Sequence, residues 1–322
     1  MINLRHMCFL LFVLSALTLG YACKKASRSA TVLSAKSDDG ALVRLRTLHK
    51  QTTMWSLRCG ASVSKERCDV GDAALFNGLL CLSGDQLSCE AVRRSQGSDG
   101  RMWRSEIRVA ADAVNSFSRD MAMGVLAYLV ATKDVSLASR WMTWIESNNW
   151  RLCRESSDNR CDFSPGFWSL FRDVWQYLRL PLNQQMDTAI LDDSLLALLQ
   201  SQFAPEGYEL HLSAVNLLIR KSMGQKSTTL DALARALTTR QNLNPFFAYL
   251  SEGGTPRTQE NLFQWCPDTA PYERTEWSFE RTEGDLPWER SMGWECLMLM
   301  NFILRDVTAN SEIRDAESLN PL

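Results

Sequence analysis

A stretch rich in tryptophan, arginine and carboxylates runs from residue 99 to residue 134 and leads into an apolar segment with helical spacing. Within it, Ser118 and Asp120 stand where that helix must begin, the usual place for a capping hydroxyl and a first-turn carboxylate. One interpretation is that these residues only start the helix. The other is that Asp120 does acid–base chemistry at the mouth of a cleft. The nearby side chains that would bind substrate are Trp103, Arg104 and Arg119.

Two further segments have the same composition, residues 68–80, which contain Asp72, and residues 271–295. Indole faces stack on sugar rings and charged groups hydrogen-bond to hydroxyls, so this composition is typical of carbohydrate sites. Glycoside hydrolysis needs one protonated and one ionised carboxylate, and Asp120 and Asp72 are our catalytic candidates. Each is equally explained as a helix-start residue. The binding candidates of the third segment are Glu283, which is also explained as a solvated surface charge, Trp288, Arg290 and Trp294.

Residues 288–294, WERSMGW, resemble the Trp-x-Arg-Gly-Asn-Gly-Trp motif of the unsaturated-glucuronyl and rhamnogalacturonyl hydrolases, members of the six-hairpin (α/α) glycosidase superfamily. Ser291 and Met292 depart from the Gly and Asn of that motif, which affects the expected substrate contacts. The resemblance implies a site at the helix-start end of a ring of helices. There an Asp or Glu protonates the substrate or activates water, roles for which Asp120 and Asp72 are best placed.

Apolar residues recur at three- and four-residue spacing along most of the chain, and alternating strand patterns are nearly absent. The pattern predicts about twelve helices in consecutive couples. The short turns between them imply antiparallel neighbours, and they are expected at residues 84–85, 133–134, 205–207 and 224–226. A stack of repeats would need a signature recurring about every 34 to 45 residues, which is missing. We therefore expect an all-α, (α/α)6 toroid-like ring, formed by a single domain over residues 39–322. The predicted helical segments are 41–57, 72–82, 86–95, 121–131, 137–145, 166–178, 189–203, 210–219, 230–239, 244–250, 259–265 and 294–304.

The first 22 residues have the pattern of a signal peptide, with basic residues before an apolar run of about 13 residues and small residues ahead of Cys23. That run is shorter than the roughly 20 residues that span a bilayer. Cleavage before Cys23 resembles the bacterial lipoprotein signal, although Gly20 replaces its usual Leu. The alternative is ordinary cleavage and a soluble exported protein. Residues 23–38, rich in Ser, Lys and Ala, are predicted to be a flexible tether.

Nine cysteines follow the signal segment's Cys8, and eight of them form close couples in an exported chain, which favours disulfides. Nearest-neighbour pairing is the simplest hypothesis, although the sequence leaves the connectivity open. The couples are Cys59 with Cys68, Cys81 with Cys89, Cys153 with Cys161, and Cys266 with Cys296. Cys23 remains for lipidation or as a free thiol. With no CxxC and few histidines, we expect no metal site.

The charge balance, 35 basic against 37 acidic residues, gives no field that would attract a nucleic acid. Nucleotide-binding motifs are absent, so no cofactor is expected. His211 has no companion histidine, and we interpret it as a satisfied interior or surface residue. The tryptophans at helical spacing, predicted to lie in the core, are Trp141, Trp144, Trp168 and Trp175.

Two function hypotheses follow. The first is an exported carbohydrate-active protein of the cell envelope, a candidate glycoside hydrolase using two carboxylates at the rim of the toroid. The second is a non-catalytic surface lipoprotein that binds a glycan or protein partner through the same rim. In both, the membrane is reached through the N-terminal lipid. Without the lipid the protein would be periplasmic or secreted.

Overall fold

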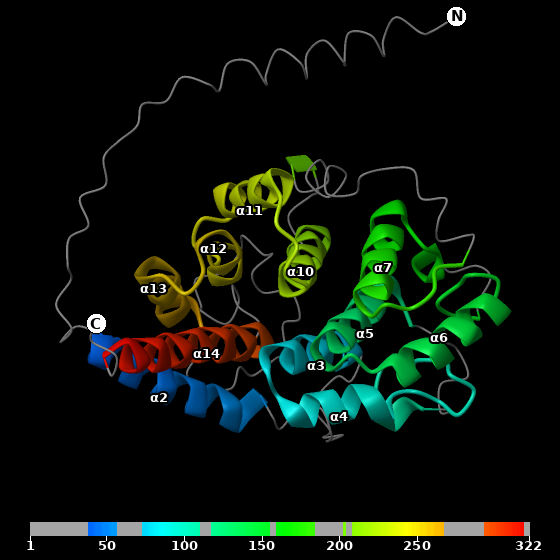
Figure 1. Cartoon of the computed structure of the whole chain (residues 1–322), viewed down its shortest axis with the longest axis horizontal. Helices are drawn as coiled ribbons and strands as arrows, with labels where there is room; N and C mark the ends of the chain where they lie inside the picture. The colour runs from blue at the N-terminus through cyan, green and yellow to red at the C-terminus, as the bar shows by residue number, and fades with distance from the viewer. Residues whose placement is uncertain are drawn as a thin grey trace, which may run out of the picture. The chain divides into compact units, whose positions relative to one another are not determined.

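The computed structural model describes residues 38–56, 73–109, 117–154, 159–183, 202–203, 208–266 and 293–318. The chain divides into two compact units, Met1–Asp39 and Gly40–Leu322, and nearly all described residues belong to the second. Within these ranges the fold is all-helical, with eleven α-helices and no strand (Figure 1). The helices are α2 (Asp38–Ser56), α3 (Ala73–Ser83), α4 (Gln86–Arg94), α5 (Arg119–Thr132), α6 (Val135–Ser147), α7 (Pro165–Tyr177), α10 (Tyr208–Ser222), α11 (Thr228–Arg240), α12 (Pro245–Glu252), α13 (Pro256–Trp265) and α14 (Gly293–Ser318), with two 3-10 turns, η1 (Glu106–Arg108) and η2 (Asn159–Cys161).

The all-α prediction is confirmed, and eleven of the predicted segments coincide with described helices. Most of the twelfth, residues 189–203, lies outside the described residues. Three predicted turns also lie where helices stop: Gly84, Lys133 and Gly224 have φ angles of 112°, 55° and 81°. A left-handed residue ends a helix because it turns the chain away from the helical path. The toroid itself remains a prediction.

Local sequence explains where several helices begin. The carboxylate of Asp85 accepts a hydrogen bond from the Ser88 amide at 2.8 Å, which caps α4. Asn244 caps α12 by accepting from the amides of Phe246 and Phe247. Proline occupies the first helical position of α7, α12 and α13, where its missing N–H costs nothing.

Contacts at both ends of α10 and α12 show that these helices run in the same direction. At their starts, the rings of His211 and Phe246 lie 5.8 Å apart. At their ends, Lys221 donates a hydrogen bond to the carbonyl oxygen of Leu250 at 2.7 Å. The helix between them returns antiparallel, since Thr238 near the end of α11 donates to the carbonyl of Phe247.

The same reasoning extends to α3, α5, α7 and α14. Near the start of α5, Arg119 donates to the carbonyl of Asp162, just before α7 begins. Late in α7, Asp173 contacts Arg220 late in α10. The final residues of α3, α5 and α10 line one cavity together with Arg305 of α14. The six helices α3, α5, α7, α10, α12 and α14 therefore begin at one end of the Gly40–Leu322 unit and point toward the other.

The contact between α3 and α5 depends on two glycines. A Cβ atom at Gly78 would overlap the backbone of Gly124, and one at Gly124 would overlap the backbone of Ala74. Glycine at both positions lets the two helices approach backbone to backbone. Figure 1 shows α3 between α14 and α5, and both neighbours pack against it.

The predicted tryptophan core is present. Trp141 and Trp175 are fully buried, Trp144 is buried and Trp168 is half-buried. Phe171 stacks on Trp175 with ring centroids 4.1 Å apart and meets the edge of Trp141 at 5.5 Å. This aromatic cluster joins α6 to α7.

Three of the expected cysteine couples form disulfides. Cα–Cα distances are 4.7 Å for Cys81–Cys89, 5.3 Å for Cys153–Cys161 and 5.8 Å for Cys266–Cys296. Disulfides are typical of proteins from oxidising, extracytoplasmic environments. Cys59 and Cys68 lie outside the described residues, as does Cys23.

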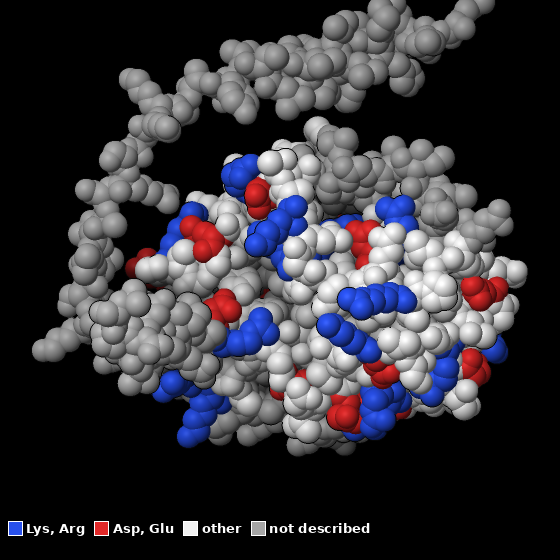
Figure 2. Space-filling model, viewed as in Figure 1, with Lys and Arg blue, Asp and Glu red and all other residues white. Residues whose placement is uncertain are grey.

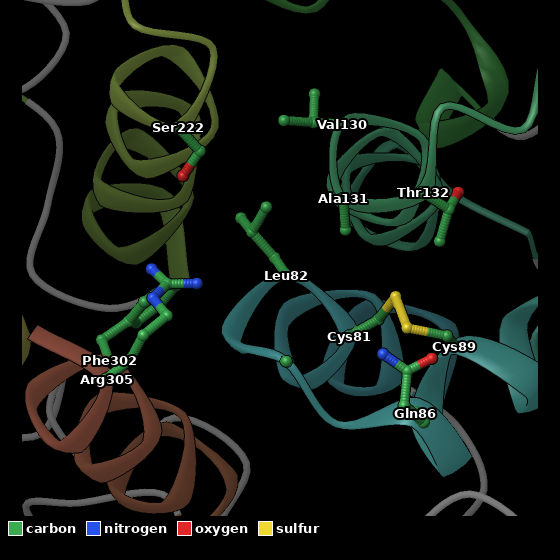
Figure 3. A pocket seen from close by; sticks show the side chains of 11 residues that line it. Cys81, Leu82, Gln86, Cys89, Val130, Ala131, Thr132, Ser222, Phe302 and Arg305 are labelled. Carbon is green, nitrogen blue, oxygen red and sulfur yellow. A yellow bond between two sulfur atoms is a disulfide. The ribbon is translucent and has the colours of Figure 1, made fainter. Parts of the chain in front are cut away.

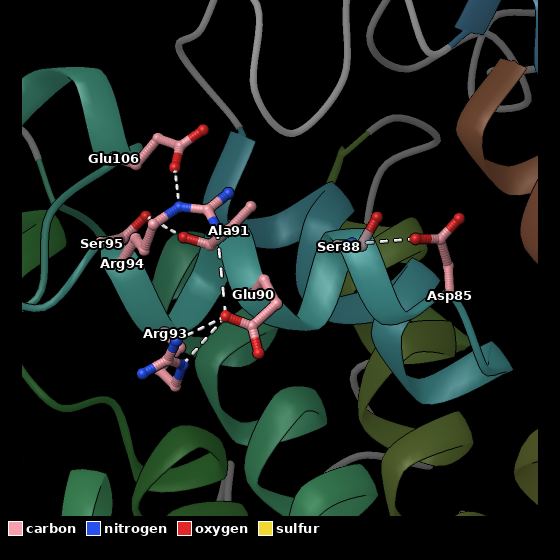
Figure 4. A network of polar contacts seen from close by, with 8 residues as sticks. All are labelled: Asp85, Ser88, Glu90, Ala91, Arg93, Arg94, Ser95 and Glu106. Carbon is pink, nitrogen blue, oxygen red and sulfur yellow. Dashed lines mark hydrogen bonds and ion pairs between the residues drawn. The ribbon is translucent and has the colours of Figure 1, made fainter.

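The described surface carries charges of both signs, interspersed on the face drawn in Figure 2. On α4, Glu90 pairs with Arg93, and Arg94 reaches Glu106 of η1 (Figure 4). Exposed pairs of this kind contribute little to stability, because solvent screens the two charges. Of the helices in the described ranges, none is long and apolar enough to cross a bilayer.

Candidate functional site

Buried polar side chains occur toward both ends of the six parallel helices, and Ser83 and Arg220, for example, lie near helix ends. Polar groups are costly to bury unless they are paired or functional, so those in the first halves of these helices form a candidate site. They include Asn77 on α3, Ser118 before α5, His211 and Ser213 on α10, Asn244 before α12, and Glu295 on α14, each at most 5 % exposed.

The central feature of this site is a contact between His211 and Glu295. Nε2 of His211 meets Oε1 of Glu295, and both side chains have zero exposure. The second carboxyl oxygen of Glu295, Oε2, is buried and has no hydrogen-bond partner among the described residues. A buried carboxyl oxygen without a hydrogen-bond partner is unusual in a native protein and is a candidate for contact with a ligand.

Several elements fix the position of Glu295. It lies in the first turn of α14, where the helix dipole favours a negative charge. The next residue, Cys296, is joined to Cys266 at the end of α13. Phe246 of α12 packs against the ring of His211. The carboxyl group therefore sits on a rigid support, as an acid or base must.

Asp120 is half-buried in the first turn of α5, so the predicted helix start is correct. The expected cap is not formed as predicted. Ser118 occupies the N-cap position, but its hydroxyl makes no bond to the helix backbone and instead contacts the carboxylate of Asp120. An N-cap serine accepts a hydrogen bond from a backbone N–H, whereas here the Ser118 hydroxyl donates its proton to the carboxylate of Asp120.

The other described candidates near Asp120 have structural contacts. Arg119 donates to the carbonyl oxygens of Asn159 and Asp162 at 2.9 and 3.0 Å, which ties α5 to the segment before α7. Trp103 is 6 % exposed, and the guanidinium of Arg101 lies 3.8 Å from its ring centroid. Trp103 is thus part of the interior, which corrects the expectation of an open stacking surface for a sugar ring.

Arg104 is half-buried, and its carbonyl oxygen accepts a hydrogen bond from the amide of Ala74 at 2.7 Å. This bond places the segment around Arg104 at the start of α3. Of Trp294, the structure describes only its place at the second position of α14. The remaining candidates lie outside the described residues: Asp72, Glu283, Trp288 and Arg290.

A cavity of about 560 Å³ lies at the opposite ends of the helices (Figure 3). The Cys81–Cys89 disulfide and Leu82 form part of its wall, and Arg305 extends from α14 toward Ser222. The described residues contain no cluster of three His, Cys, Asp or Glu side chains that could hold a metal ion.

The sequence interpretation missed the importance of Glu295, whereas its interpretation of His211 as a satisfied interior residue agrees with the buried contact between the two side chains. A signal was present, because Glu295 is the one charged residue within the mostly apolar run 294–304. Charged residues are almost never fully buried without a partner, so this position called for a partner on another helix. His211 is 84 residues away in the sequence, so local spacing could not identify it as that partner.

No protein-family model, curated protein or solved structure matches this chain.

Proposed function

We propose that the protein is a carbohydrate-active hydrolase with an (α/α)6 toroid fold and a site at the starts of α3, α5, α7, α10, α12 and α14. The observation that carries this proposal is the buried Glu295 carboxyl group, held by His211 at the end where these six helices begin. The common direction of the six helices, with antiparallel α11 between α10 and α12, supports the toroid.

The resemblance of residues 288–294 to the unsaturated-glucuronyl and rhamnogalacturonyl hydrolases supports a site at the same end of the molecule. The last two residues of that motif, Gly293 and Trp294, open α14, and Glu295 follows directly. A carboxylate and a sugar-binding motif would therefore be neighbours in one site. We assign the two carboxylates of a hydrolase to Asp120 and Glu295, with Asp72 as the further candidate.

The two carboxylates differ in their surroundings. Glu295 has no exposure and contacts His211, whereas Asp120 is half-buried and contacts Ser118. Glycoside hydrolysis needs two carboxylates in different roles, and this difference supports the assignment. The three disulfides are consistent with export into an oxidising compartment, and the lipid anchor on Cys23 belongs to this proposal.

The test measures reducing-end release from a panel of uronate-containing and neutral polysaccharides. Asp120→Asn and Glu295→Gln should each lower turnover by about 10²-fold or more, the usual contribution of an acid or base catalyst. The matched control is Asp231→Asn, which changes an exposed first-turn aspartate of α11. Turnover equal to the parent in both variants, with melting temperatures unchanged, would exclude these carboxylates as catalysts.

The second function, a non-catalytic surface lipoprotein, is favoured by the zero exposure of both Glu295 and His211, which an interior structural pair also needs. A glycan-binding assay separates the two. Saturable binding to the parent protein without product release on any polysaccharide would favour the binding function over hydrolysis.

A further inference from the structure

A second cavity, of about 320 Å³, lies between α2, the turn after α3, and α14. Its wall includes His49 of α2, Ser83 and Asp85 beside the turn, and Asn301 of α14, with Leu297 and Leu304 as apolar neighbours. Neither His211 nor Glu295 lines it. Cavities of this size are at the lower end of the range that holds small molecules, about 300 to 1,000 Å³.

A chain of hydrogen bonds determines which nitrogen of His49 carries the proton. The Ser83 hydroxyl donates its one proton to the carbonyl of Leu80 at 2.7 Å. It must therefore accept from the Asn301 amide nitrogen, which lies 2.9 Å away. That orientation turns Oδ1 of Asn301 toward Nε2 of His49 at 2.7 Å, and an oxygen can only accept.

Nε2 of His49 is consequently the protonated nitrogen. In neutral imidazole the other nitrogen, Nδ1, is then a hydrogen-bond acceptor. His49 lines the cavity and is half-buried, so a ligand from solvent can reach it. The wall thus offers a fixed acceptor for a ligand that brings an N–H or O–H donor.

The charge of the cavity selects among such ligands. Asp85 is the one formally charged group among the described residues of the wall. Its Oδ1 caps α4 through Ser88, which leaves Oδ2 for another donor. The C-terminal end of α3 and the N-terminal end of α4 carry opposite partial charges beside the same turn, so the carboxylate of Asp85 supplies the net charge of the wall. This carboxylate and the Nδ1 acceptor together favour a cation.

We propose that this cavity binds a small organic cation with N–H donors, either a primary ammonium or a guanidinium compound. The cation donates to the carboxylate of Asp85 and to Nδ1 of His49, and its short alkyl part lies against Leu297 and Leu304. Hydrogen bonds to charged groups contribute more than neutral ones, so both contacts should contribute to the affinity. The site is independent of the carbohydrate site proposed above.

The experiment is calorimetric titration of the full chain with butylammonium and butylguanidinium, and with butan-1-ol and butyrate as neutral and anionic counterparts. We expect saturable one-to-one binding of the cations and no binding of the other two. Nitrogen-15 spectra of the ligand-free protein should show the Nε2-protonated tautomer of His49. A proton on Nδ1 in the neutral ring would overturn the proposal.

Two variants test the contacts and preserve the local structure. His49→Gln keeps an N–H donor for Asn301 but replaces the Nδ1 acceptor by a carbonyl oxygen at a different position, and Asp85→Asn keeps a good N-cap without the charge. Each should weaken binding by about tenfold or more. The control is Asp134→Asn, which changes the N-cap of α6 outside the cavity wall and should bind the cations like the parent.

Three further outcomes would overturn the proposal. They are equal binding of butan-1-ol, unchanged cation affinity in both variants, and absence of cation binding at about 10 mM, a concentration at which a useful site is occupied. Saturable binding of Zn²⁺ to the protein, without any binding of the two organic cations, would overturn it as well. Thermal melts of each variant exclude loss of the fold as the cause of weaker binding.

Discussion

Glu295 and His211 are in direct contact inside the protein although 84 residues separate them in the sequence. One lies in the first turn of α14 and the other near the start of α10, and neither side chain reaches solvent. Two titratable groups buried together depend on each other, because either alone would be a polar group without adequate compensation.

The first prediction is therefore a large coupling between these two residues. His211→Leu should lower the free energy of unfolding by about 3 to 5 kcal/mol, because it leaves a buried carboxyl group without its imidazole partner. Glu295→Leu should cost a similar amount. The double variant should lose less than either single variant, because it removes both polar groups. Urea denaturation of the four proteins measures the cycle.

A coupling free energy below about 0.5 kcal/mol, the scatter of independent sites, would contradict this view of the pair. Asp173 and Arg220 provide a comparison within the same protein. They too are in contact, but Asp173 is partly accessible, with 14 % of its side chain exposed. Their coupling should be smaller, since solvent screens the pair.

The second prediction concerns the close approach of α3 and α5. Gly124→Ala should destabilise the protein by at least about 1 to 3 kcal/mol, because the new Cβ would overlap the backbone of Ala74 and Leu75. Gly40→Ala is the matched control in α2, where a Cβ meets open space. It should be neutral or stabilising by up to about 1 kcal/mol, since alanine favours a helix. Chemical denaturation of both variants gives the two signs, and equal effects would show that the helices separate easily.

Much of the fold was predictable from local patterns. Apolar spacing placed all eleven described helices, and a turn residue such as Gly84 or Lys133 marked where a helix ends. Both signals act over a few residues, so a single sequence contains them. The common direction of the six helices was not visible, because it depends on contacts such as Lys221 with Leu250, which are not neighbours in the sequence.

The site was less predictable for the same reason. Composition selected Trp103 as a binding residue, yet its ring is buried beneath Arg101. The local composition is the same whether an aromatic residue beside arginines faces solvent or the core. Glu295 gained its importance from a histidine on another helix. Burial and long-range pairing decide such roles, and neither is encoded by local spacing.

The third prediction compares two disulfides by the length of chain that each encloses. Cys266–Cys296 spans 30 residues and Cys81–Cys89 spans 8. In the chain-entropy model the longer loop constrains the unfolded state more, so its loss should cost about 3.7 kcal/mol against about 2.5 for the shorter one. Paired Cys→Ser variants and urea denaturation test the order. The reverse order would indicate that effects on the folded state outweigh loop length.

The fourth prediction is an alkaline loss of stability through buried tyrosines. Burial, and then the 2.8 Å hydrogen bond to Asp134, raise the pKa of Tyr128 above its ordinary value, and burial does the same for Tyr249. The unfolded chain releases each phenolic proton near pH 10, whereas the folded protein retains it. This contribution is complete below about pH 10 and is lost as the pH rises through the folded pKa, by up to about 1.4 kcal/mol per pH unit for each tyrosine.

Urea denaturation between about pH 8 and pH 11, the range around the ordinary tyrosine pKa of about 10, tests this prediction. The free energy of unfolding should decline less steeply with pH in Tyr128→Phe than in the parent. It should decline least steeply in the variant that also carries Tyr249→Phe. The slope is the decisive quantity, since the lost hydrogen bond lowers stability at every pH; identical slopes in the parent and the double variant would show that other groups cause the alkaline loss.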